Sequence, residues 1–183
     1  MDSLRNHFLI AMPHLKGDIF ADSLTYICEH NEDGALGIII NKTLPIKLSE
    51  ILSELDILAN ASSEDINVMA GGPVSTGQGF ILHSDNEFPD ASLRTGPGIY
   101  LTTSKDVLSA ISEDKGPLEF LVSLGYAGWD AGQLEDELAN NFWLTCPADA
   151  DIIFKTPVKD RLAVATQSLG ISLDQISSEA GHA

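Results

Sequence analysis

Residues 125–137 read GYAGWDAGQLEDE, and this stretch constrains the fold more than any other. An apolar run of strand character over 118–124 leads into a turn at Gly125, and a helix is expected over 131–141, where leucines recur four residues apart. Glycine allows positive φ angles and the close approach of another surface. The stretch therefore predicts a strand, a tight turn and a helix with polar groups near its start.

A second glycine-rich stretch, GGPVSTGQGFILH at 71–83, follows a short strand expected over 67–70. Because both glycine-rich stretches follow apolar strands in one domain, they are expected to meet in space and to border one depression. Backbone amides beside the hydroxyls of Ser75 and Thr76 could cradle a phosphate, but the stretch lacks the Gly-Lys-Ser/Thr ending of a P-loop. A tight turn between two strands accounts for the same glycines.

The chain as a whole predicts about eight short strands and four helices, without a regular βαβ rhythm. The expected strands are a hairpin of 24–30 and 35–41 with its turn at Asn31–Gly34, and others at 7–12, 80–83, 99–102 and 151–155. Helices are expected at 48–55, after Ser104, and from Thr156–Pro157 to Gly170. A linker is expected at 59–66, a long loop at 84–97 and a frayed tail at 171–183. The pattern indicates the α+β class, with a mixed, strongly bent or split sheet flanked by helices in one domain, 1–183.

Charge and cysteine content narrow the function classes. Ten basic residues against 27 acidic ones give a net charge of −17, and no cluster of lysines and arginines occurs. Duplex binding normally rests on a basic patch, so direct nucleic-acid binding is not expected. The apolar run Phe8–Met12 is too short for a signal peptide, and no run reaches the length of a membrane span. With two cysteines that fit a reducing compartment, a cytoplasmic protein is expected.

Two histidines and one cysteine could carry chemistry. Cys28 and His30 are two residues apart on a strand, so they are expected on one face, where the imidazole could activate the thiol. Packing explains the same spacing, and Cys28 is expected to be a buried structural thiol. His83 ends an expected strand and could be a base or a metal ligand, although a hydrogen bond to a loop explains it equally well. No spacing typical of a metal site supports either histidine.

Trp129, Asp130, Gln133 and Glu135 are the strongest candidates for a binding site. Trp129 offers a large apolar face and one N–H donor. In the alternative, Trp129 fills the core and Glu135 lies on a solvated helix N-terminus, where a carboxylate is favourable. No nucleophile elbow of the Gly-x-Ser-x-Gly type occurs.

Ordered motifs run along nearly the whole chain: HFLIAMP at 7–13, DIFADSLTYICEHNEDGALGIIIN at 18–41, GGPV at 71–74, GFILH at 79–83, GYAGWDAGQLEDEL at 125–138, Trp143, and IIFKTP at 152–157 before a helix that ends in LGI. Together these motifs resemble the YqgE/AlgH family of bacterial proteins. The resemblance implies an α+β fold whose split sheet is partly curled into a small barrel, and a role as a transcriptional regulator. The family has no agreed catalytic residues, so the resemblance assigns none.

Two positions depart from the family pattern. Gln78 stands where these proteins usually have arginine, which removes a cation from the glycine-rich stretch and weakens the case for an anion site there. Leu162 stands where they usually have tryptophan, which indicates a packing change on a helix face.

The expected function is that of a non-enzymatic regulator that acts through a small ligand or a protein partner rather than by direct DNA binding. No catalytic residue, metal or cofactor is expected. The alternative is an uncharacterised enzyme, hydrolase-like or thiol-based, that uses His83 or Cys28. The residues expected to bind the ligand are Gly71, Gly72, Ser75, Thr76, His83, Trp129, Asp130, Gln133 and Glu135.

Overall fold

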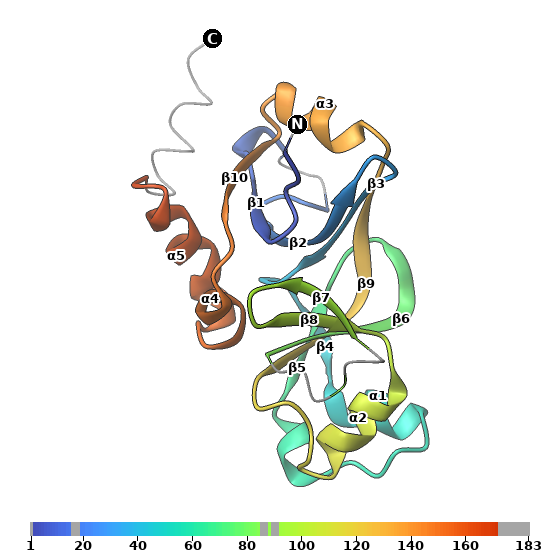
Figure 1. Cartoon of the computed structure of the whole chain (residues 1–183). Helices are drawn as coiled ribbons and strands as arrows, with labels where there is room; N and C mark the ends of the chain where they lie inside the picture. Colours follow the sequence, from blue (N-terminus) through green and yellow to red (C-terminus); the bar gives the residue numbers. More distant parts are fainter. Residues whose placement is uncertain (1, 16–18, 85–87, 89–91, 172–183) are drawn as a thin grey trace.

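The computed structural model describes residues 2–15, 19–84, 88 and 92–171 (Figure 1). Ten strands lie in this part of the chain: β1 His7–Ala11, β2 Leu24–Asn31, β3 Gly34–Ile39, β4 Thr43–Lys47, β5 Asn67–Ala70, β6 Val74–His83, β7 Ser92–Gly96, β8 Ile99–Thr102, β9 Phe120–Asp130 and β10 Trp143–Pro147. The five helices found there are α1 Leu48–Glu54, α2 Lys105–Ser112, α3 Gln133–Ala139, α4 Ala150–Phe154 and α5 Arg161–Ser168. No described helix is long and apolar enough to cross a membrane.

The strands form one curled, mainly antiparallel sheet in the order β10-β1-β2-β3-β9-β6-β8-β7, and the α+β class is therefore confirmed. Off this path, β5 pairs with β9 in parallel and with β4. The long strand β9 changes partners along its length, because Phe120–Leu124 and Tyr126 pair with β6 and Ala127–Asp130 pairs with β3. Gly125, with φ of 72°, lies just before this change, where a register shift interrupts the pairing with β6. A positive φ of this kind suits glycine.

Three groups of buried apolar side chains make up the core. The barrel cluster lies within the curled sheet and includes Phe8, Tyr26, Ile38, Leu82 and Ile153. The α1–α2 cluster includes Leu48, Leu52, Ile81, Val107 and Val122. The tryptophan cluster includes Leu9, Ile27, Trp129, Leu134 and Trp143. Figure 1 shows the same division, with α1 and α2 together at one end of the molecule, α3 at the other, and α4 and α5 beside β10.

Polar side chains join β7 to β2 where the sheet curls round on itself. The hydroxyls of Tyr26 and Thr95 are 2.8 Å apart, and Arg5 Nε donates to the Thr95 carbonyl over 3.1 Å. Thr95 Oγ1 in turn donates to the carbonyl of Ile99 over 3.1 Å. Burial raises the pKa of Tyr26, so its hydroxyl stays protonated and can take part in this network.

Several local predictions hold. The hairpin turn at Asn31–Gly34 is confirmed by the pairing of these two residues at the end of β2 and β3. Ser104 is the N-cap of α2, and its Oγ accepts from the Asp106 N–H. Gly170, with φ of 74°, follows the C-cap residue of α5.

Other local predictions are wrong. The strand expected over 151–155 is the helix α4, because Asp149 caps it by accepting from the Asp151 N–H over 2.9 Å. A short apolar run fits a buried strand and a buried helix equally well, and the cap decides between them. The turn expected at Gly125 is interior to β9.

The remaining differences concern element boundaries and short elements that the sequence did not predict. The helix expected over 131–141 extends only over 133–139, and a turn of 3₁₀ helix occupies 61–64 of the expected linker. β4 was not expected as a strand, and the helix expected from Pro157 begins at Arg161. Within the loop expected over 84–97, β7 forms over 92–96. Residues 85–87, 89–91 and 172–183 lie outside the described part, which therefore lacks six residues of that loop and most of the expected tail.

Candidate functional site

The two glycine-rich stretches meet, as expected, because β6 and β9 pair with each other. Val74 lies opposite Tyr126 and Gly79 opposite Leu124, with a register shift between the two pairs. A Cβ placed on Gly72 would overlap the backbone of Tyr126, and one on Gly125 would overlap the carbonyl of Gly72. Glycine at these positions therefore permits the close approach of two backbones.

Next to this crossing lies an open depression of about 500 Å³, here called the acidic depression. The carboxylates of Glu29, Asp33 and Asp130 line it together with Val74 and Tyr126. Two of the expected ligand residues, Trp129 and Asp130, are among its lining residues. Among the described residues, no group of three histidine, cysteine, aspartate or glutamate side chains is placed so that it could hold a metal ion.

A second and more apolar cavity of about 480 Å³, here called the α1–α2 cavity, lies between these two helices and the sheet. Its apolar lining includes Ile51 and Leu55 from α1, Leu108 from α2, and Ile81 and Val122 from the sheet. Glu50, Glu54 and Lys105 also line it, as do Gly77, Gln78 and Gly79.

Gly79 explains why the α1–α2 cavity is open. It precedes Ile81 by two residues and pairs with Leu124, so it lies on the sheet face that carries the α1–α2 cluster. A Cβ at Gly79 would meet no atom within 4 Å, and the same is true of Gly77. Two side chains are thus missing from a face that alternation would otherwise fill.

The sequence prediction missed this cavity because, within the glycine-rich stretch 71–83, it chose Gly71, Gly72, Ser75, Thr76 and His83 and not Gly77 or Gly79. The available indication was that Gly77, Gly79 and Ile81 alternate on one face of β6, opposite the apolar stripe of α1. Of the expected residues, Ser75 and Thr76 are exposed at the start of β6 and Gly71 is buried beside Gly125.

Trp129 and Gln133 serve a different arrangement, centred on Glu137. One oxygen of the Glu137 carboxylate accepts from Nε1 of Trp129 and from Nε1 of Trp143, each over 2.8 Å. Its other oxygen accepts from Gln133 Nε2 over 2.9 Å, while Gln133 Oε1 accepts from the Asp130 N–H. Both tryptophan side chains are about 5% exposed. Glu137 was not among the expected residues, although it follows Gln133 by one helical turn.

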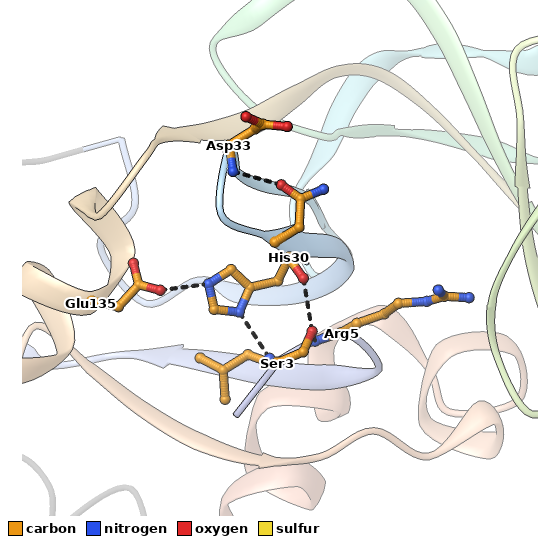
Figure 2. A network of polar contacts seen from close by, with 7 residues as sticks. Ser3, Arg5, His30, Asp33 and Glu135 are labelled. Atoms are coloured by element: carbon orange, nitrogen blue, oxygen red, sulfur yellow. Dashed lines mark hydrogen bonds and ion pairs between the residues drawn. The ribbon is translucent and has the colours of Figure 1, made fainter. Parts of the chain in front are cut away.

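His30 holds the N-terminal segment against α3, as Figure 2 shows. Its Nδ1 accepts from the Leu4 N–H over 2.9 Å, and its Nε2 is 2.9 Å from Glu135 Oε1. Ser3 Oγ donates to the His30 carbonyl over 2.8 Å. Because Nδ1 is an acceptor, the neutral ring carries its proton on Nε2 and donates it to Glu135. The Glu135 pKa is lowered, first by a hydrogen bond with its own backbone N–H and further by His30.

His30 and Cys28 lie on opposite faces, so the prediction of a shared face is wrong. A β-bulge between Ile27 and Glu29 shifts the register, and Glu29 pairs with Leu36 while His30 pairs with Ala35. Leu36 packs on the barrel cluster, which contains Cys28, whereas Ala35 packs on the tryptophan cluster. An extra residue in one strand reverses the alternation beyond it. The imidazole therefore cannot activate the thiol.

Cys28 and His83 are both buried. Cys28 has 0% exposure, and its burial raises the pKa of the thiol. His83 has 0% exposure, stacks on Tyr100 with ring centres 5.5 Å apart, and has its Nε2 2.9 Å from Ser92 Oγ. Neither residue lines the acidic depression or the α1–α2 cavity. Their surroundings are those of packed core residues.

Comparison with known proteins places the chain within a widespread group. A family model described as AlgH-like matches residues 8–174. A UPF0301 protein of Hahella chejuensis is 49% identical over 183 residues, which are 100% of this chain and 98% of that protein. A UPF0301 protein of Saccharophagus degradans is 48% identical over 181 residues and is covered over 89% of its length.

Two solved structures share the fold. The solution structure of the AlgH protein from Pseudomonas aeruginosa is 47% identical, with a TM-score of 0.83 over 99% of this chain and 96% of that one. A crystal structure of a protein from Corynebacterium diphtheriae is 19% identical, with a TM-score of 0.73 over 92% of this chain and 87% of that one. The second likeness concerns the fold alone.

Proposed function

This chain belongs to the AlgH-like family, and from that premise we propose that it is a non-enzymatic regulator of the cytoplasm. It binds a small ligand in the α1–α2 cavity, and the bound state acts on a protein partner rather than directly on DNA. The descriptions AlgH-like and UPF0301 name no activity, and the support for the proposal comes from the cavity and the charges of this chain.

The observation that carries the proposal is the α1–α2 cavity itself. Small-molecule sites are typically concave spaces of about 300–1,000 Å³ with mostly apolar walls and a few polar groups, and this cavity fits that description. Gly77 and Gly79 keep it open on a sheet face where alternation would otherwise place side chains.

The positions of the titratable groups support a binding role over a catalytic one. An enzyme site needs a nucleophile or base that converges with other polar groups on a cavity. Cys28 and His83, the residues of the enzymatic alternative, face packed interiors and not the cavity. The raised pKa of Cys28 also keeps its thiol protonated and unreactive.

Ligand identification from the purified protein tests the proposal. Protein expressed in bacteria would be washed and denatured, and the released small molecules would be measured by mass spectrometry. Gly79→Leu should abolish the released ligand because its side chain enters the cavity, whereas Gly79→Ala adds one methyl group and should retain most of it. The same compounds in equal amounts from wild type and Gly79→Leu would contradict the proposal.

A further inference from the structure

The α1–α2 cavity combines an apolar interior with charges of both signs. Glu50 and Glu54 are four residues apart on α1 and therefore lie on one side of that helix. Lys105, the first residue of α2, lines the same cavity from the other helix. Among the described residues, no ion pair joins Lys105 to either glutamate. Both signs of charge thus line one cavity without pairing with each other.

These charges are available to a ligand. Glu50 Oε1 accepts from the Lys47 N–H at the start of α1, which leaves its second oxygen. Glu50, Glu54 and Lys105 are all exposed, so a ligand can reach them without first breaking a buried contact. Gln78 is also among the lining residues, between the two open glycines.

We infer that the α1–α2 cavity binds an apolar zwitterion, meaning a molecule with an ammonium and a carboxylate at one end and a branched or aromatic hydrocarbon body. A free apolar amino acid has this chemistry. The inference rests on the proposed function, because it names the class of ligand for the same cavity. The ammonium pairs with Glu50 and Glu54, the carboxylate pairs with Lys105, and the hydrocarbon contacts the apolar residues of α1, α2 and the sheet.

Molecules with only one of the two charges fit less well. A hydrocarbon with a lone carboxylate would bring a negative charge close to two glutamates, and one with a lone ammonium would bring a positive charge close to Lys105. Like charges in such proximity reduce affinity and select against the wrong ligand. A zwitterion pairs with both signs, and burial of its hydrocarbon body supplies the remaining affinity.

Isothermal titration calorimetry with three matched probes tests the inference. The probes are leucine, 4-methylpentanoate, which lacks the ammonium, and 3-methylbutylamine, which lacks the carboxylate. Leucine should bind at least about tenfold more tightly than either analogue, since each charge-assisted contact contributes a factor of about ten or more. Gly79→Leu should abolish the binding of leucine.

Two charge variants assign the contacts. Lys105→Gln should weaken leucine and 4-methylpentanoate about tenfold and should not weaken 3-methylbutylamine, whose repulsion by Lys105 it removes. Glu54→Gln should weaken leucine and the amine and should not weaken the acid, for the corresponding reason. Lys115→Gln is the matched control, because Lys115 pairs with Glu113 after the far end of α2 and does not line the cavity.

The failures of the two proposals differ. Equal affinity for the three probes, or equal effects of each variant on all of them, would overturn the zwitterion while the cavity remains a ligand site. A released ligand that lacks one or both charges, found in wild type and lost in Gly79→Leu, would likewise overturn the zwitterion and leave the cavity as a ligand site. If no probe binds wild type and no ligand is released from it, both proposals are wrong.

Discussion

Glu137 joins two tryptophans to α3 through one carboxylate. Trp129 and Trp143 each donate to the same carboxylate oxygen, and Gln133 donates to the other. The ring centres of Trp129 and Trp143 are 6.0 Å apart, so one acceptor sets the position of both rings in the tryptophan cluster. Trp129 and Gln133, which looked like site residues in the sequence, are here part of a partly buried polar network.

Glu137→Gln should lower the free energy of unfolding by about 1–3 kcal/mol. An amide offers one acceptor oxygen where the carboxylate has two, so either the tryptophan N–H groups or Gln133 would face an NH₂ group. Urea unfolding followed by tryptophan fluorescence would measure the loss. Asp136→Asn, at an exposed position of the same helix with no side-chain hydrogen bond among the described residues, should change stability by less than about 0.5 kcal/mol. Equal losses in the two variants would argue against the network.

His30 and Glu135 make the attachment of the N-terminal segment sensitive to pH. The Glu135 pKa lies below its ordinary value of 4.5, so its ionised form contributes stability that is present above that value and is lost as pH falls through the folded-state pKa. His30 accepts from the Leu4 N–H and contacts this carboxylate through its Nε2, so loss of the Glu135 charge weakens the attachment of the N-terminal segment.

Glu135→Gln should therefore be less stable than wild type at pH 7, and the difference should shrink below about pH 4. Urea denaturation at both pH values would measure it. Because Glu135 is partly exposed, we predict the direction in which the stability difference between wild type and Glu135→Gln changes with pH, and not its size. A difference that grows as the pH falls would contradict the assignment.

At the scale of elements, the crossing of β6 and β9 depends on glycine. Gly72 has φ of 155°, and any Cβ there would overlap the backbone of Tyr126. Gly77, only five residues further along, faces open space. These two glycines look alike in the sequence, but only Gly77 has room for a side chain.

Gly72→Ala should destabilise the protein by at least about 3 kcal/mol, because two backbones must separate to admit the methyl group. Gly77→Ala should change stability by less than about 1 kcal/mol. Thermal unfolding of the two variants beside wild type would show the contrast. Similar melting temperatures for both variants would mean that the close approach at Gly72 is relaxed at little cost.

At the scale of the whole molecule, the charge of −17 dominates behaviour at a distance. A field of this sign repels the phosphate backbone and favours cationic partners. Fluorescence anisotropy with a labelled DNA duplex at physiological salt should show no binding at micromolar protein, because the electrostatic contribution to duplex affinity is unfavourable. Sub-micromolar binding that weakens as salt increases would show that basic residues far apart in sequence form a local patch.

Sequence patterns alone determined the class of fold and the position of most strands. The hairpin about Asn31–Gly34 and the cap of α2 at Ser104 were predictable, because turn and capping preferences are local properties of a few residues. The meeting of the two glycine-rich stretches was predictable too, since such glycines indicate close approach.

Only the tertiary structure decided the face on which His30 lies, the helical state of 150–154 and the existence of the α1–α2 cavity. A β-bulge reverses alternation without a reliable sequence mark, and Ile152 and Ile153 suit a buried strand as well as a buried helix. The cavity depends on how α1 and α2 cover the sheet at Gly79. Local patterns determine which residues are apolar and where the chain turns, whereas register and helix placement arise from contacts between residues far apart in the sequence.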